Sequence, residues 1–149
     1  MLGDRKRSRG RVILAVTVMA QAIDVVQGML EAYRGGTDEA LAYFHPEVAY
    51  DTTVRPDGRV WHGREGVRRA MFEWTSTWDE FEMQIERCIP APDGRVVALW
   101  RERGRAKGSG LTVAEHGVSV FTVQDGMIVS VVVHLDRRAA LQDAGLHSA

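Results

Sequence analysis

The residues whose types and spacing could carry out chemistry are His134 and Asp136, in the segment SVVVHLDRRAALQDAGL, residues 130–146. Side chains alternate between the two faces of a strand, so these two fall on one face. A histidine beside a carboxylate can take up and release a proton near neutral pH, as acid–base catalysis requires. Alternatively, the pair forms only the polar edge of an amphipathic strand.

A third candidate is His116 in AEHGVSV, on the strand face that it shares with Val118 and Val120. It is either a further catalytic histidine or a structural one. The five histidines show no H-x-H or H-x-x-x-H spacing, which predicts no metal site. The sequence contains no glycine-rich phosphate loop after a strand and no G-x-S-x-G motif, so we expect no cofactor.

Composition is that of an ordinary globular domain, with 149 residues, 45% hydrophobic residues and a net charge of −1. This charge gives no reason to expect a nucleic-acid partner. Cys88 is the only cysteine, so no disulfide can form within the chain. A free thiol fits a reducing compartment, and we expect a cytoplasmic protein.

The first 19 residues form an extension to the predicted domain, residues 20–149. A basic segment, RKRSRGR, precedes the apolar segment VILAVTVMAQA, as in a signal peptide. The extension is therefore upstream translation, an extra strand or a signal-like segment, and the protein would be secreted if residues 1–22 act as a signal peptide. The apolar segment is too short to cross a membrane, so no membrane partner is expected.

Helices are predicted over three segments with apolar residues at helical spacing. The first covers residues 20–33 and ends at RGGT, the second is the short segment DEALAYF, and the third covers residues 65–78. A short helix over residues 137–146 closes the chain.

Strands are predicted at EVAYDTTV and VWHG, before and after the turn RPDGR. After Asp79 the sequence alternates through four longer strands, the last two joined by an Asp125–Gly126 hairpin turn. The pattern predicts an α+β fold in which helices pack on one face of a mostly antiparallel sheet.

Three segments resemble the SnoaL-like (polyketide cyclase-like) branch of the nuclear transport factor 2-like superfamily. They are EAYRGGTDEALAYFHPEVAYD, WHGREGVRRAM and VFTVQDGMIVSVVVHLDRRAALQDAGL. The resemblance implies a cone, also described as a cystatin-like α+β roll, whose curved sheet wraps around three N-terminal helices and encloses an apolar pocket. Members include cyclases, isomerases, epoxide hydrolases, dehydratases and non-catalytic binding domains, so the fold does not select an activity.

The resemblance gives roles to several residues. Asp136 matches the acid–base aspartate of the SnoaL-like cyclases, which faces the pocket, and His134 would share its proton or hold a substrate oxygen. Asp51 matches the general base of the ketosteroid isomerases. Those isomerases also use a tyrosine to stabilise the enolate oxygen, but Met29 falls near the expected helix position. Asp136 could instead cap the helix that begins at Arg137.

Large aromatic residues are expected to line or close the pocket. Trp61, Trp100, Tyr50 and Phe121 are the predicted substrate contacts, whereas Trp74 and Trp78, at helical spacing, are typical of a core. The related epoxide hydrolases use an arginine between two carboxylates, with arginine and aspartate two residues apart on one strand. In the corresponding segment WRERGR, the residue two positions after Arg101 is Arg103 and not an acid. Its arginines are expected on a solvated strand face.

Together these features predict a cofactor-independent enzyme, a cyclase, isomerase or lyase, that transfers protons on a small hydrophobic carbonyl substrate. The alternative is a non-catalytic domain of the same fold that binds a small ligand or mediates dimerisation. The resemblance also places the opposite face of the last strand against a second subunit. This expected homodimer surface consists of Val129, Val131, Val133 and Leu135.

Overall fold

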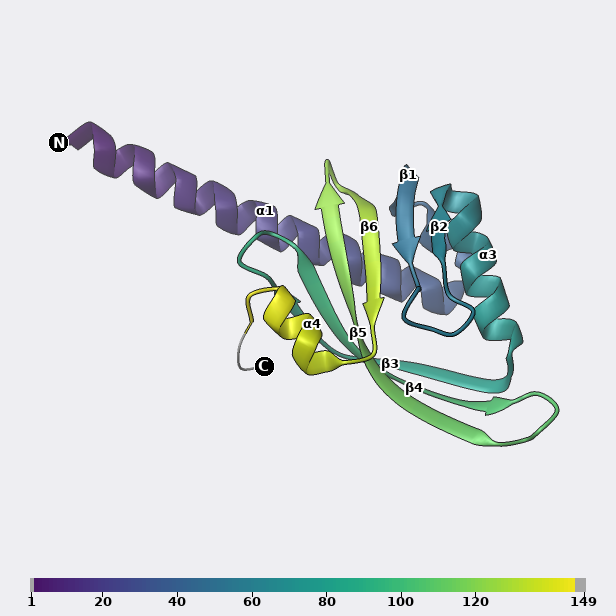
Figure 1. Cartoon of the computed structure of the whole chain (residues 1–149). Helices are drawn as coiled ribbons and strands as arrows, with labels where there is room; N and C mark the ends of the chain where they lie inside the picture. Colours follow the sequence, from purple (N-terminus) through teal and green to yellow (C-terminus); the bar gives the residue numbers. More distant parts are fainter. Residues whose placement is uncertain (1, 147–149) are drawn as a thin grey trace.

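The computed structural model describes residues 2–146, with side chains from residue 16 onward, and shows a curved, open sheet with helices on both faces (Figure 1). The strand order is β2-β1-β6-β5-β4-β3. Strands β1 and β6 are parallel, and the other neighbouring pairs are antiparallel. This confirms the α+β prediction. The strands are β1 Phe44–Asp51, β2 Val60–His62, β3 Trp78–Pro90, β4 Val96–Ala106, β5 Thr112–Gln124 and β6 Met127–His134.

Helix α1, Leu2–Gly35, is longer than the predicted helix because residues 2–19 continue it. The extension therefore has a helical backbone, and the extra-strand alternative is wrong. Its turns project beyond the sheet in Figure 1, where Val16 is 61% exposed. Further along, Ala22, Val26 and Met29 recur at helical spacing and are buried against the sheet. Among the described residues, no helix has the length and apolar character needed to cross a bilayer.

Helices α2, Thr37–Leu41, and α3, Gly63–Ser76, follow the predicted order. Helix α3 packs against β1 and buries Val67 and Ala70. It ends before Trp78, which begins β3. Helices α1 and α3 therefore lie on the concave side of the sheet and leave space between themselves and the strands.

Helix α4, Arg137–Asp143, packs on the other, convex face. Its buried residues Ala140 and Leu141 contact a cluster that includes Val97, Leu99 and Val118 from β4 and β5. Side chains of these strands alternate between two hydrophobic cores, one beneath α4 and one beneath α1.

The hairpin between β5 and β6 contains two residues with left-handed backbone, Asp125 at φ 51° and Gly126 at φ 76°. Two such residues form the tight turn that suits the twist of a hairpin, and Gln124 pairs with Met127. This confirms the predicted turn. A register shift between Thr122 and Val123 follows it, so the regular alternation of faces holds for β6 from Ser130 onward.

The predicted homodimer surface is wrong in its central residues. Val131 and Val133 are 1% and 5% exposed, and they line the cavity on the concave side, beside their cross-strand partners Phe121 and Ser119. The aliphatic residues Val131 and Val133 of β6 therefore point inward, toward the cavity. Val129 is half-buried, and Leu135 lies just beyond the end of the strand at 36% exposure.

Candidate functional site

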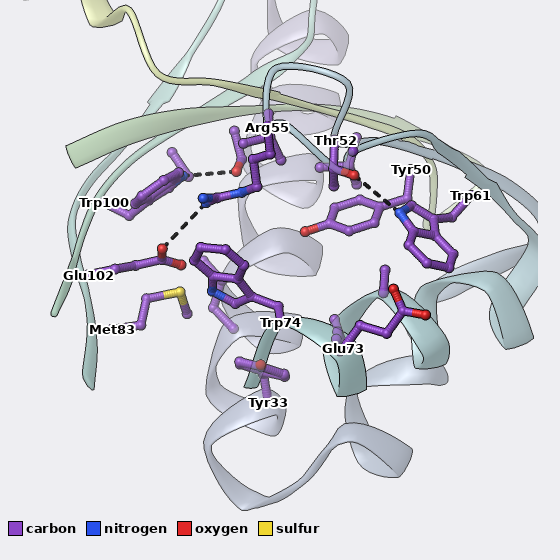
Figure 2. A pocket seen from close by; sticks show the side chains of 18 of the residues that line it. Tyr33, Tyr50, Thr52, Arg55, Trp61, Glu73, Trp74, Met83, Trp100 and Glu102 are labelled. Atoms are coloured by element: carbon purple, nitrogen blue, oxygen red, sulfur yellow. Dashed lines mark hydrogen bonds and ion pairs between the residues drawn. The ribbon is translucent and has the colours of Figure 1, made fainter. Parts of the chain in front are cut away.

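A cavity of about 370 Å³ lies on the concave side of the sheet (Figure 2). Its wall is formed by α1, α3, the sheet and the loop between β1 and β2. Such a volume is in the range of small-molecule sites. Aromatic side chains dominate the wall, among them Tyr33, Tyr50, Trp61, Trp74, Trp100 and Phe121.

The most polar part of the cavity is centred on Arg55, from the loop between β1 and β2. Its Nη1 donates to Glu115 Oε1 at 2.6 Å, and its Nη2 lies 3.4 Å from Glu102 Oε2. The guanidinium also stacks on the ring of Trp74, with Cζ 3.7 Å from the ring centroid. Among the described residues, Arg55 is the one cationic side chain lining the cavity, and carboxylates neutralise it.

Glu102 is the carboxyl group of this site that is deepest in the protein, with a side chain only 10% exposed. Burial raises its pKa to about 7, the positive charge of Arg55 opposes this rise, and the neighbouring Glu115 adds to it. Glu102 is therefore divided between its acid and carboxylate forms near neutral pH. A group in this state can both accept and return a proton.

Two phenols also reach the cavity, Tyr33 from α1 and Tyr50 from β1 (Figure 2). Burial raises the pKa of both, that of Tyr50 to about 12, and the nearby Glu102 adds to each shift. Both therefore remain protonated near neutral pH. Neither hydroxyl makes a hydrogen bond to another described residue, so both are free to donate to a ligand oxygen.

Trp100 forms a fixed part of the wall on β4. Its indole lies over Gly117, the residue opposite it on β5, and Nε1 donates to Ser119 Oγ at 3.0 Å. A Cβ at position 117 would lie 2.2 Å from Trp100 Cζ2. The absent side chain at Gly117 therefore makes room for the ring, and Ser119 fixes its orientation.

The loop that carries Arg55 is held at its base by Thr52. The Thr52 hydroxyl donates to the carbonyl oxygen of Arg59 and accepts from Trp61 Nε1 at 3.1 Å, and the backbone N–H of Thr52 also donates to Arg59. Trp61 is 8% exposed, and Arg59 covers its ring. These contacts place the loop so that Arg55 extends into the cavity.

The four predicted substrate contacts, Tyr50, Trp61, Trp100 and Phe121, all line the cavity. Trp74, for which helical spacing leaves a core position or a place in the pocket wall open, also lines the cavity. Trp78 does not line it and packs edge-on against Trp74, with ring centroids 5.4 Å apart.

The predicted catalytic pair lies elsewhere. Asp136 is exposed and caps α4, its Oδ1 accepting from the backbone N–H of Ala139 at 3.0 Å. His134 pairs with Val118 on the convex side of the sheet and does not line the cavity. The expected inward orientation of both residues is thus incorrect. Val131 and Val133, of the opposite parity, face the cavity instead.

Asp51 and His116 are also outside the cavity. Asp51 Oδ1 accepts from the backbone N–H and the hydroxyl of Thr53, and Tyr50 takes the inward direction on β1. His116 is exposed and pairs with Arg101 on β4. The four predicted catalytic residues are therefore not brought together at one site.

Sequence reasoning missed Arg55, Glu102, Glu115 and Tyr33. One signal was available: Glu102 lies two residues after Trp100, a predicted ligand contact, and therefore shares its strand face. Tyr33 lies one helical turn after Met29 on α1 and lines the cavity.

The sequence indicates that WRERGR lacks the epoxide-hydrolase pattern of an arginine and an aspartate two residues apart on one strand. The structure builds an arginine between two carboxylates from a loop and two adjacent strands, through Arg55, Glu102 and Glu115. Arg101, Arg103 and Arg105 of that segment are exposed, as predicted. Among the side chains that the structure describes, no three potential ligands gather closely enough to hold a metal ion.

Several solved structures share this fold. An NTF2-like protein of unknown function from Burkholderia pseudomallei is 20% identical, with a TM-score of 0.67 over 82% of this chain and 95% of that one. TerC, crystallised with polyporic acid, is 17% identical, with a TM-score of 0.66 over 84% and 98%. A candidate polyketide cyclase from Xanthomonas campestris is 23% identical, with a TM-score of 0.64 over 85% and 98%.

Identities this low show the fold alone. Among curated proteins, none matches this chain. The family model described as "SnoaL-like domain" matches residues 26–131, which include the C-terminal part of α1, all of α2, α3 and β1 to β5, and the first part of β6. The chain therefore belongs to the SnoaL-like domain family, within the NTF2-like fold that its structure displays.

Proposed function

We propose that the protein is a cofactor-independent enzyme that transfers a proton on a small hydrophobic carbonyl compound. The observation that carries this proposal is Glu102, a buried carboxyl group with a pKa of about 7, in an aromatic cavity that also holds two free phenols. Its family includes polyketide cyclases, which is consistent with cyclase-type chemistry.

In the proposed reaction, the carboxylate of Glu102 removes a proton from the carbon next to the carbonyl group. The C–H bond breaks, its electron pair forms an enolate, and Tyr33 and Tyr50 donate hydrogen bonds to the enolate oxygen. Glu102, now protonated, returns the proton to another carbon in an isomerisation. In a cyclisation, the enolate carbon attacks a second carbonyl group and the new alkoxide takes the proton.

The lining of the cavity favours a flat and uncharged substrate. The aromatic wall offers stacking surfaces, whereas Arg55 already pairs with Glu102 and Glu115 and offers no free charge to an anion. TerC, a structural neighbour, was crystallised with polyporic acid, which supports testing polycyclic carbonyl compounds.

The test is a panel of polycyclic ketones, screened first for binding by tryptophan fluorescence and then for turnover. We expect Glu102→Gln to lower kcat by at least about 100-fold while leaving ligand affinity nearly unchanged, because Gln keeps the shape and cannot exchange the proton. Glu82→Gln, on the exposed face of the neighbouring strand β3, is the matched control and should be fully active.

Full activity of Glu102→Gln would contradict the proposed role of this residue. Tight binding of a compound that the wild-type protein never converts would instead identify a non-catalytic binding domain. A monomer in light scattering at micromolar concentration would count against the expected homodimer.

A second candidate reaction is the opening of an epoxide by water. The observation that favours it is the position of Arg55 between two carboxylates. In this reaction the acid form of Glu102 gives its proton to the epoxide oxygen as the C–O bond breaks. Water attacks the ring carbon, and the Glu102 carboxylate takes the proton that this water loses. Small epoxides therefore belong in the same panel, and formation of a diol would select this reaction.

A further inference from the structure

We infer that Glu115 is a positioning residue: by holding the Arg55 guanidinium, it prevents Arg55 from pairing fully with Glu102, which keeps Glu102 able to hold and exchange a proton. This inference rests on the proposed acid–base role of Glu102. Glu115 itself does not line the cavity and need not touch a substrate.

The sheet register brings the two carboxylates together. Glu102 on β4 is the direct cross-strand partner of Glu115 on β5, so both side chains leave the sheet on the same face. Like charges opposite each other on a sheet repel, and the cation of Arg55 lies between them to compensate.

Arg55 does not divide its contacts equally. Its distance to Glu115 is 2.6 Å, that of a strong charge-assisted hydrogen bond, whereas its distance to Glu102 is 3.4 Å. The Glu115 side chain is 27% exposed and that of Glu102 is 10% exposed. Glu115, the more exposed carboxylate, thus makes the stronger contact with Arg55. The weaker contact of Glu102 does less to offset the free-energy cost of burying its charge.

The guanidinium is restrained in this unequal position. It stacks 3.7 Å from the centroid of Trp74, which fixes its plane. Its own backbone is tied within the loop, because Arg55 N–H donates to the Thr52 carbonyl oxygen and the Arg55 carbonyl oxygen accepts from Gly58 N–H. Arg55 can shift toward Glu102 only if the contact with Glu115 is removed.

The other titratable groups around Glu102 cannot substitute for Glu115. Tyr33 from α1 and Tyr50 from β1 are neutral near pH 7, Trp74 from α3 carries no charge, and the register partner of Glu102 on β3 is Met83. Glu73 from α3 also lines the cavity, but it is about half-exposed and pairs with Arg59. Glu115 is therefore the anion that acts on Glu102, both by direct repulsion and by holding Arg55.

The experiment measures the titration of Glu102 by carboxyl-carbon NMR in the ligand-free protein, with the resonance assigned by its loss in Glu102→Gln. We expect the pKa of Glu102 to fall by about one pH unit or more in Glu115→Gln, because Arg55 then pairs with Glu102 alone. Glu115→Thr also removes the charge, keeps a residue suited to a strand, and should show the same fall. The control Glu82→Gln should leave the titration unchanged.

An unchanged pKa of Glu102 in either folded Glu115 variant would overturn the inference. The titration needs no substrate, so its outcome is separate from that of the proposed function. If a substrate is found, the acidic limb of the kcat/KM profile should move to lower pH in Glu115→Gln. A shifted titration without any turnover in the wild-type protein would leave the inference standing and contradict the enzyme proposal.

Discussion

Two carboxyl groups of this protein show how surroundings decide what a residue does. Asp136 is exposed and its oxygen is used by the backbone of α4, so it stabilises a helix end. Glu102 lies in an aromatic cavity, where the loss of water favours its neutral form. The two carboxyl groups differ in burial. The two-residue spacing of His134 and Asp136 in the sequence does not indicate whether Asp136 is buried.

Replacing Asp136 by Ala should lower the free energy of unfolding by about 1 kcal/mol, because the N-terminus of α4 loses its side-chain cap. Ligand binding in the cavity should not change, since Asp136 does not line it. Urea unfolding and fluorescence binding measure the two effects. Asp136→Ser, which keeps a capping oxygen, is the control; lost turnover at unchanged stability in Asp136→Ala would restore a catalytic role for this residue.

For strand β6 the sequence predicts correctly which residues share a face. The prediction of which face points into the cavity is wrong. Two-residue spacing separates Ser130, Val132 and His134 from Val131 and Val133, as the sequence predicts. The resemblance directed the polar face inward, whereas the aliphatic face lines the cavity. A strand pattern defines two faces, and only the packing of α1 and α3 on one side decides which of them is inside.

The elements themselves were largely predictable because each has a local signal. The Asp125–Gly126 turn, the buried helical spacing of α1 and the alternation of β3 all agree with the structure. The polar site was not predictable in this way, since Arg55 comes from a loop and its two partners from different strands. Their proximity depends on sheet register, which leaves no fixed spacing in the sequence.

The pairing of β4 with β5 makes a testable contribution through Gly117. Gly117→Ala should lower the free energy of unfolding by about 1–3 kcal/mol, because the new Cβ would lie 2.2 Å from Trp100 Cζ2 and 2.8 Å from the His134 carbonyl oxygen. Displacement of the indole should also alter its fluorescence. The double variant Gly117→Ala/Trp100→Phe should recover part of the loss, and fully additive effects would contradict this contact.

At the scale of the whole molecule, the convex side of the sheet forms an apolar core and the concave side forms the cavity. The convex side is partly covered by α4 and completes an apolar core, whereas the concave side faces α1 and α3 and leaves a cavity. Glu102 is buried in the cavity only when the chain is folded, so its pKa differs between the folded and unfolded states. The stability of the protein must therefore depend on pH.

The stability of the protein should therefore fall as pH rises from about 4.5 to about 7. The pKa of Glu102 is raised from 4.5 to about 7 in the folded state, so in this interval the folded protein binds more protons than the unfolded chain. The effect is on the order of 3 kcal/mol at most. It is measured as the difference in unfolding free energy between wild type and Glu102→Gln, because titrations common to both proteins then cancel. That difference should favour the wild type more at pH 5 than at pH 8, and equal differences at the two pH values would show that Glu102 titrates as an ordinary exposed carboxyl group.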